Sequence, residues 1–164
     1  MRALSDDEPS AGAPGRAGAP PPGTASRIPV TLVFLVLGVA TGTWAARVPA
    51  LKSALHLSSG ELGLVLLGPA AGTVLAMPAT GLLLATVAPR RLVRTGLVAM
   101  AGLLPVTTLA TSGLQLFAVL AGWGFGIGVV DVSMNTEAAA VQQRLGRRVM
   151  SSFHASYSIG GLVG

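Results

Sequence analysis

The chain contains no cysteine, and only 10% of its residues are charged and 4% aromatic. Without cysteine it can form neither disulfides nor thiolate metal sites. Soluble domains carry about 25% charged residues, so the low charge and the 51% of hydrophobic residues argue against an ordinary soluble domain. No cluster of side chains suggests a metal site, and we expect neither a metal nor a cofactor.

The chain carries a formal net charge of +5, which in a soluble domain can indicate nucleic-acid binding. Here the arginines occur in short groups between apolar runs, with few aromatic residues beside them. Arginines that flank membrane spans explain this pattern better, so we expect no nucleic-acid partner. The stretch GWGFGIG follows no strand and precedes no P-loop lysine, so it does not predict a nucleotide site. Nothing else in the sequence indicates an enzyme.

Residues 1–27 are rich in proline, glycine and alanine and include the stretch EPSAGAPGRAGAPPPGTAS. They lack the apolar side chains whose burial would offset the entropy lost on folding, so we predict a disordered tail. The length of this tail and its acidic residues at positions 6–8 are not those of a signal peptide. We therefore expect no cleavage.

Apolar runs follow the tail, and residues 28–164 are predicted to form a transmembrane domain. The first run, IPVTLVFLVLGVATGTWAA, has no charge and is about long enough to cross a ~30 Å hydrocarbon core. The predicted spans cover residues 28–46, 60–87, 92–110, 114–141 and 150–164. The last span reaches only ~22 Å as a helix and is therefore incomplete. The predicted fold is all-α, a polytopic bundle of transmembrane helices in a lipid bilayer.

Local signals accompany these spans. Residues 47–59 are predicted to form a loop, in which Ser58 followed by Glu61 is a capping box that starts the second helix. The prolines inside predicted spans are Pro69, Pro78 and Pro105. Neighbouring helices can satisfy the carbonyl groups that proline leaves free, so we expect kinks at these positions rather than helix ends.

The basic residues predict the topology. Arg27 precedes the first span, and the first loop holds only Arg47 and Lys52. The arginines at the second and fourth loops are Arg90, Arg91, Arg94, Arg144, Arg147 and Arg148. The positive-inside rule then places the N-terminus and both arginine-rich loops in the cytoplasm. The expected location is the plasma (inner) membrane.

Three stretches of the sequence stand out. They are ARVPALKSALHLSSGELGLVLL between spans one and two, GIGVVDVSMNTEAAAVQ at the end of span four, and GRRVMSSFHASYSIGGLVG entering span five. Together they resemble the N-terminal half of a major facilitator superfamily (MFS) transporter. The resemblance implies a parent with twelve spans in two halves, each built of three-helix inverted repeats. This chain would supply about four and a half of those spans, and the missing C-terminal half would be its partner.

In the family that the chain resembles, a glycine, an aspartate and basic residues between spans two and three help to lock the cytoplasmic gate. The stretch GLLLATVAPRRLV keeps Gly81, Arg90 and Arg91 at the matching positions, whereas Ala85 and Ala88 replace the usual aspartate and second glycine. The two arginines therefore have two interpretations, as residues of a gate loop or as positive-inside anchors.

The resemblance also implies that spans one and four line the central cavity. In span one, the candidates for contact with a solute are Thr41, Trp44 and Arg47. Trp44 has a second interpretation as an interfacial anchor, and Arg47 as an outer-surface residue rather than a ligand for an anionic solute. Gly38 and Gly42 form a G-x-x-x-G pair, which is typical of close helix packing.

In span four, Gly124, Gly128, Asp131 and Asn135 recur at steps of three or four residues, which places them on one helix face. The glycines allow another backbone or a solute to come close. Carboxylates inside membrane spans usually face a polar interior or a partner. Asp131 is thus either a proton-linked or gating carboxylate, with Asn135 holding the solute or a neighbouring helix, or a hydrated residue at the membrane boundary that orients loop arginines.

His154, near the start of span five, is a further candidate. Adjacent antiparallel helices would bring it near Asn135, and histidine titrates near neutral pH, so a contact with Asp131 or Asn135 would sense protons. The alternative is a histidine at a helix start that bonds the backbone or Ser151.

Glu137 lies two residues beyond Asn135 and points nearly the opposite way around the helix. We assign it to the membrane–water interface. There we expect an ion pair with Arg144 or Arg148.

These features predict a fragment of a secondary transporter that moves a small-molecule solute by alternating access, with protons as the candidate coupling ion. The alternative is a truncated membrane protein that does not transport, or an assembly partner of another membrane protein.

Overall fold

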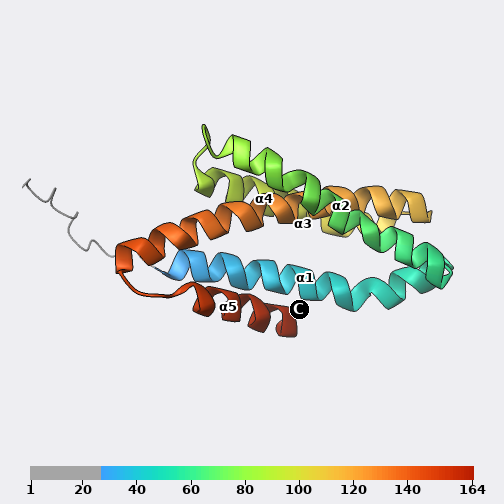
Figure 1. Cartoon of the computed structure of the whole chain (residues 1–164). Helices are drawn as coiled ribbons and strands as arrows, with labels where there is room; N and C mark the ends of the chain where they lie inside the picture. Colours follow the sequence, from blue (N-terminus) through green and yellow to red (C-terminus); the bar gives the residue numbers. More distant parts are fainter. Residues whose placement is uncertain (1–26) are drawn as a thin grey trace, which may run out of the picture.

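The computed structural model describes residues 27–164, and the tail predicted to be disordered lies, but for Arg27, outside this part. The described residues fold into five α-helices and one short 3-10 helix, with no strand among them (Figure 1). The elements are α1 (Ile28–Ala54), α2 (Ser59–Leu83), α3 (Pro89–Val106), η1 (Thr107–Leu109), α4 (Gly113–Leu145) and α5 (Met150–Val163). The predicted all-α class is confirmed.

Four stretches within the described residues are long and apolar enough to cross a membrane, namely α1, α2, α3 together with η1, and α4. Their outward sides carry large exposed apolar side chains such as Leu64, Val74 and Val98, which suit contact with lipid tails. The chain is therefore a bundle of transmembrane helices. With 14 residues, α5 is only about 21 Å long.

The first helix is longer than the predicted first span. Residues 47–54 continue α1, with Pro49 inside the helix, where the sequence predicts a loop. The extra turns are held by packing, because Leu51 is buried together with Leu57, Val65 and side chains of α4. Hydropathy alone does not include such contacts, so it ends the span too early.

The predicted capping box at the start of α2 is confirmed. The backbone N–H of Ser58 donates to Oε2 of Glu61 over 2.8 Å, and the backbone N–H of Glu61 donates to Oγ of Ser58 over 3.3 Å. The capping box therefore starts α2 within one residue of the predicted position. The three prolines expected inside spans lie inside helices, Pro69 and Pro78 in α2 and Pro105 in α3.

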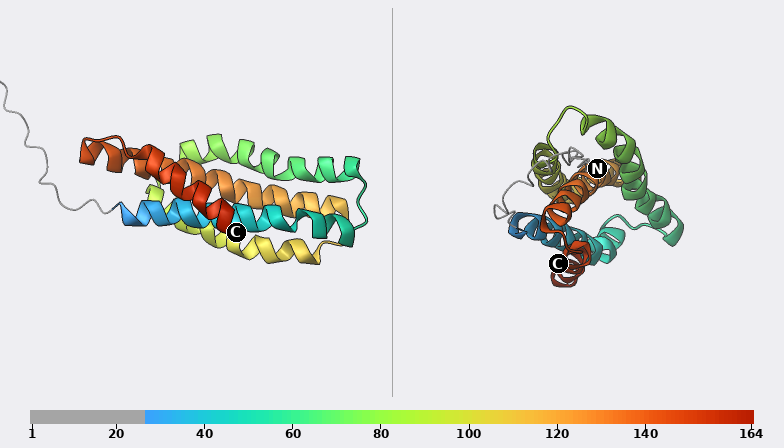
Figure 2. Two further views of the ribbon diagram at one scale, coloured as in Figure 1. Left: turned by 90° about the horizontal axis from the view of Figure 1, so that it is seen from below. Right: turned by 60° about the vertical axis from the view of Figure 1, so that its left-hand side comes forward.

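Glycines lie at the contacts between paired helices, and Figure 2 shows the arrangement of these helices in two further views. A Cβ atom on Gly72 of α2 would meet backbone atoms of Ala121 and Phe125 in α4, and one on Gly42 of α1 would meet the backbone of Gly161 in α5. In both pairs the contacts advance in the same direction along the two helices, so α2 runs parallel to α4 and α1 runs parallel to α5. This is the close packing that the G-x-x-x-G pair predicts.

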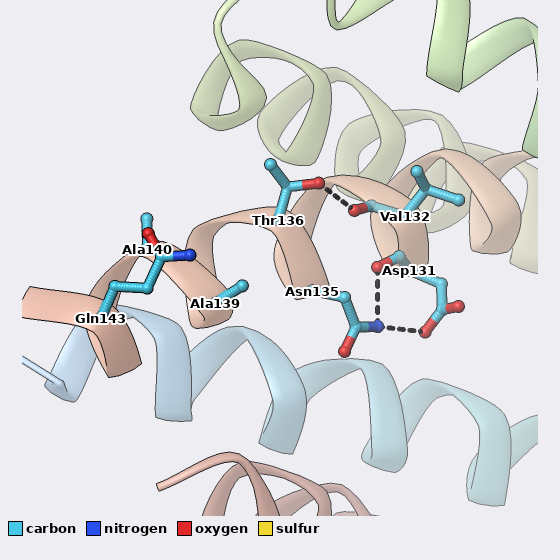
Figure 3. A pocket seen from close by; sticks show the side chains of 7 residues that line it. All are labelled: Asp131, Val132, Asn135, Thr136, Ala139, Ala140 and Gln143. Carbon is cyan, nitrogen blue, oxygen red and sulfur yellow. Dashed lines mark hydrogen bonds between the residues drawn. The ribbon is translucent and has the colours of Figure 1, made fainter. Parts of the chain in front are cut away.

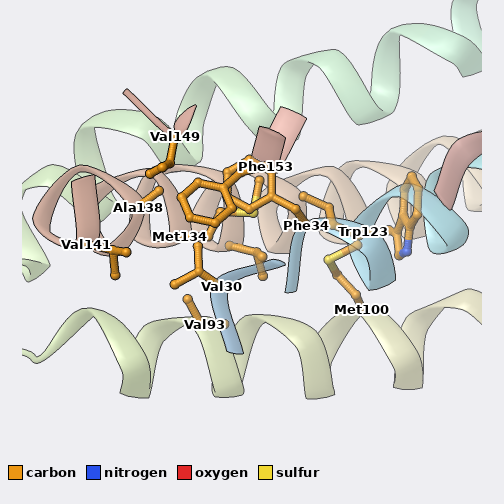
Figure 4. Close-up of a cluster of buried hydrophobic side chains, with 12 residues drawn as sticks. Val30, Phe34, Val93, Met100, Trp123, Met134, Ala138, Val141, Val149 and Phe153 are labelled. Carbon is orange, nitrogen blue, oxygen red and sulfur yellow. The ribbon is translucent and has the colours of Figure 1, made fainter. Parts of the chain in front are cut away.

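The largest buried cluster joins α1, α3, α4 and the start of α5 (Figure 4). The ring of Phe34 in α1 stacks on that of Phe153 in α5, with centroids 5.6 Å apart. On the other side of the cluster, Val93 and Met100 of α3 pack towards α4. The stack sets where α5 begins relative to α1, and with it the position of His154.

Candidate functional site

An open groove of about 690 Å³ runs along the C-terminal part of α4 (Figure 3). Its lining residues are Asp131, Val132, Asn135, Thr136, Ala139, Ala140 and Gln143. They form two neighbouring rows on the helix, each with steps of four residues, because four residues make slightly more than one turn. One helix thus supplies the whole lining of the groove.

Asp131 and Asn135 are hydrogen-bonded to each other at one end of the groove (Figure 3). Nδ2 of Asn135 donates to the backbone carbonyl oxygen of Asp131 over 2.9 Å and to its carboxylate Oδ1 over 3.1 Å. Both side chains are partly exposed. The structure therefore places a carboxylate and an amide as one unit, with the second carboxylate oxygen and the amide oxygen left for other partners.

Gly124 and Gly128 share the helix face of this pair but contact α2. A Cβ atom on Gly124 would lie 2.6 Å from Cα of Pro69, and one on Gly128 would lie 2.6 Å from Cβ of Ala76. Of the two predicted uses of these glycines, the structure shows the approach of another backbone. The helix face changes neighbour along its length, because α2 covers its first half and leaves the groove open.

His154 lies on α5, within the range at which a charge on its ring would act on the carboxyl group of Asp131. Its ring packs edge-on against Phe34, with centroids 5.2 Å apart and planes at 81°. Among residues 27–164 no hydrogen bond joins the His154 side chain to Asp131, to Asn135 or to Ser151. The structure thus brings α5 near α4 without a direct contact between His154 and Asp131 or Asn135, which is one of the two interpretations of this histidine.

The three candidates of span one lie away from the groove. Thr41 donates to the carbonyl oxygen of Leu37 over 2.8 Å within its own helix, and Arg47 is exposed. The ring of Trp44 packs on that of Trp123 in α4, with centroids 5.5 Å apart. Trp123 is only 1% exposed, and neither indole N–H finds a hydrogen-bond partner in the described part of the chain. Trp44 is therefore a packing residue between helices in this structure.

The first turn of α3, which holds Arg90 of the predicted gate loop, makes an ion pair with α4. Nε of Arg90 lies 3.3 Å from Oε2 of Glu137, with the two side chains 73% and 22% exposed. The predicted pairing of Glu137 with Arg144 or Arg148 is wrong. Arg144 stands two helical turns further along α4, about 10 Å away, whereas the antiparallel packing of α3 on α4 brings Arg90 alongside.

The other two residues of the predicted gate loop make no comparable contact. A Cβ atom on Gly81 would have nothing within 4 Å of it, and Arg91 is exposed. In the described structure, Arg90 is thus the member of this loop that is tied to another helix.

Two known proteins that are similar to this chain are named as transporters. It is 34% identical over 143 residues to an uncharacterized MFS-type transporter of Yersinia pestis, a match that covers 87% of this chain and 37% of that protein. It is 35% identical over 133 residues to the uncharacterized transporter y4wD of Sinorhizobium fredii, covering 80% and 35% of the two. The chain is a relative of the MFS-type transporters.

The chain is also 28% identical over 135 residues to the membrane protein MosC of Rhizobium meliloti, a match that covers 82% of this chain and 33% of that protein. The chain spans about a third of the length of the curated relatives that it matches. No family profile matches it. No solved structure matches it either.

The sequence patterns alone do not predict the whole lining of the groove on α4. Thr136, Ala140 and Gln143 line it, although only Asp131 and Asn135 are singled out by their chemistry. Continuing the step of four residues beyond Asn135 would have found Ala139 and Gln143. Within residues 27–164, no group of three or more His, Asp or Glu side chains could hold a metal ion.

Proposed function

We propose that this chain is part of a secondary transporter that moves a small-molecule solute across the membrane by alternating access, with protons as the coupling ion. The two relatives from Yersinia pestis and Sinorhizobium fredii described above, both called transporters, support the transport role. The observation that carries the role of the site is the partly exposed carboxylate of Asp131 in an apolar helix, open to a groove. A carboxylate at membrane depth is costly, and such groups mark pathways for substrates and protons.

The hydrogen bond between Asp131 and Asn135 offers a route for coupling. An ionised carboxylate accepts from the Asn135 amide at Oδ1, and charge-assisted hydrogen bonds are the stronger ones. Protonation of Asp131 would weaken this bond and remove the negative charge from the groove, which would change the affinity of the groove for a solute. The remaining part of the protein, which would include the other half of the cavity, would close the groove from the opposite side.

Replacement of Asp131 by asparagine is expected to abolish the part of solute uptake that a pH gradient drives, because the amide cannot take up a proton. The measurement uses the full-length protein in proteoliposomes, with a solute identified by an uptake screen.

Glu137→Gln is the matched control, because it removes one carboxylate from the opposite side of the same helix. It should keep the response to the pH gradient. If Asp131→Asn couples to the gradient as well as the unsubstituted protein does, the carboxylate has no part in coupling.

The orientation in the membrane is a second part of the proposal. The structure brings the start of α1 beside the start of α5, where Arg27 donates to Oγ of Ser152 over 2.7 Å, and Arg90 beside Glu137. The arginine-rich ends of the helices thus lie at one end of the bundle, which supports a cytoplasmic position for that end.

A phosphatase reporter that is active only outside the cytoplasm tests this orientation. Fused after Ser112 it should be active, and fused after Gly146 it should be inactive. A green fluorescent protein that folds only in the cytoplasm, fused at the same two sites, should give the opposite pattern. Phosphatase activity at Gly146 with none at Ser112 would reverse the proposed topology.

A further inference from the structure

We infer that the groove on α4 binds a small protonated amine. The inference rests on the proposed transport function and names the class of solute that this site would take. It follows from three properties of the groove, namely which hydrogen-bonding atoms remain free, which charges are uncompensated, and what lines the rest of its wall.

The free polar atoms at the Asp131 end of the groove are hydrogen-bond acceptors. The amide nitrogen of Asn135 faces two oxygens of Asp131, which fixes the orientation of the amide and turns its donors away from a solute. Its carbonyl oxygen, like Oδ2 of Asp131, can only accept. Thr136 uses its hydroxyl hydrogen on the carbonyl oxygen of Val132 over 2.8 Å. A solute at this end must therefore bring donors of its own.

The negative charge of Asp131 has no direct counter-ion in the described structure. Arg90, the arginine that reaches α4, is paired with Glu137. A charge on His154 of α5 would act on Asp131 at longer range. The ring of His154 packs on Phe34, and His154 makes no ion pair with Asp131. A buried or half-buried carboxylate is stabilised by a cation at short range. Charge complementarity thus favours a positively charged donor at this position.

The rest of the groove wall is apolar and small. Val132, Ala139 and Ala140 line it, which leaves room for a compact apolar body beside the charged end. Gln143 is the remaining polar residue of the lining, but it lies eight residues beyond Asn135, about 12 Å along the helix.

Benzylamine, benzyl alcohol and benzoate test the inference, because they share a ring and differ in charge. Binding of each to the purified full-length protein in detergent is measured by isothermal titration calorimetry at pH 7. Benzylamine is expected to bind at least about tenfold more tightly than benzyl alcohol, as a hydrogen bond to a charged group predicts, and benzoate more weakly than both. Asp131→Asn should remove the preference for the amine, whereas Glu137→Gln should keep it.

Equal binding of the three probes, tighter binding of the alcohol or of benzoate, or no binding of benzylamine would overturn the inference. Persistence of the amine preference in Asp131→Asn would do the same. The comparison on the unsubstituted protein decides the question even if a variant does not fold.

The amine-binding inference and the proposed transport function have separate tests, because calorimetry measures binding without transport. Amine binding to a protein that carries no solute in proteoliposomes would leave the inference standing and end the proposed function. Asp131-dependent transport of a neutral or anionic solute would support the proposed function and overturn the inference that the groove binds an amine.

Discussion

Replacement of Gly72 by leucine is expected to push α2 away from α4 and to lower the stability of the folded protein. The new Cβ atom would fall onto the carbonyl oxygen of Ala121 and within 2.6 Å of the backbone nitrogen of Phe125. These are backbone atoms of α4, which cannot rotate away as a side chain can. Overpacking a close contact costs about 1–3 kcal/mol or more, and a clash between two backbones lies at the upper end. The apparent Tm of the full-length protein should fall by about 6–12 °C.

Gly63→Leu is the matched control in the same helix, because a Cβ atom there would have nothing within 4 Å. It should leave the Tm unchanged or raise it slightly, since leucine favours the helix by up to about 1 kcal/mol relative to glycine. The measurement is fluorescence-detected size-exclusion chromatography of a fluorescent fusion after heating in detergent. Equal melting of the two variants would mean that α2 and α4 do not pack as the structure shows.

Replacement of Gly160 by alanine is expected to weaken the contact between α1 and α5. The added methyl group would fall onto the carbonyl oxygen of Leu35 and within 2.9 Å of the backbone nitrogen of Val39. The expected loss of stability is about 1–3 kcal/mol, which corresponds to a fall of about 2–12 °C in the Tm. The same heating and chromatography assay measures it on the full-length protein.

The neighbouring glycine provides the control for this contact. A Cβ atom on Gly161 would meet only the carbonyl oxygen of Gly38, at 3.9 Å, so Gly161→Ala should melt like the unsubstituted protein. The two variants add the same methyl group to adjacent positions of one helix, and only the helix face differs. A larger loss in Gly161→Ala than in Gly160→Ala would contradict the register of α1 against α5.

The candidate site shows how far residue patterns lead. Helical periodicity places Asp131 and Asn135 on one face, and the structure joins them by a hydrogen bond. The same periodicity places Gly124 and Gly128 on that face, yet it contains no information on which neighbour covers them. The structure shows α2 on the glycines and a groove at the polar pair. The roles of these side chains in binding and coupling stay predictions that the experiments above address.

The sequence by itself determined the all-α class, the capping box at Ser58 and Glu61, and the apolar stretches long enough to cross a membrane. Composition, helix capping and hydropathy are properties of consecutive residues, so they can be read without a fold. Only the tertiary structure decided that α1 continues to Ala54, that Trp44 packs on Trp123, and that Glu137 pairs with Arg90. Each of these depends on contacts between helices that are far apart in the chain, and the geometry of helix packing sets them.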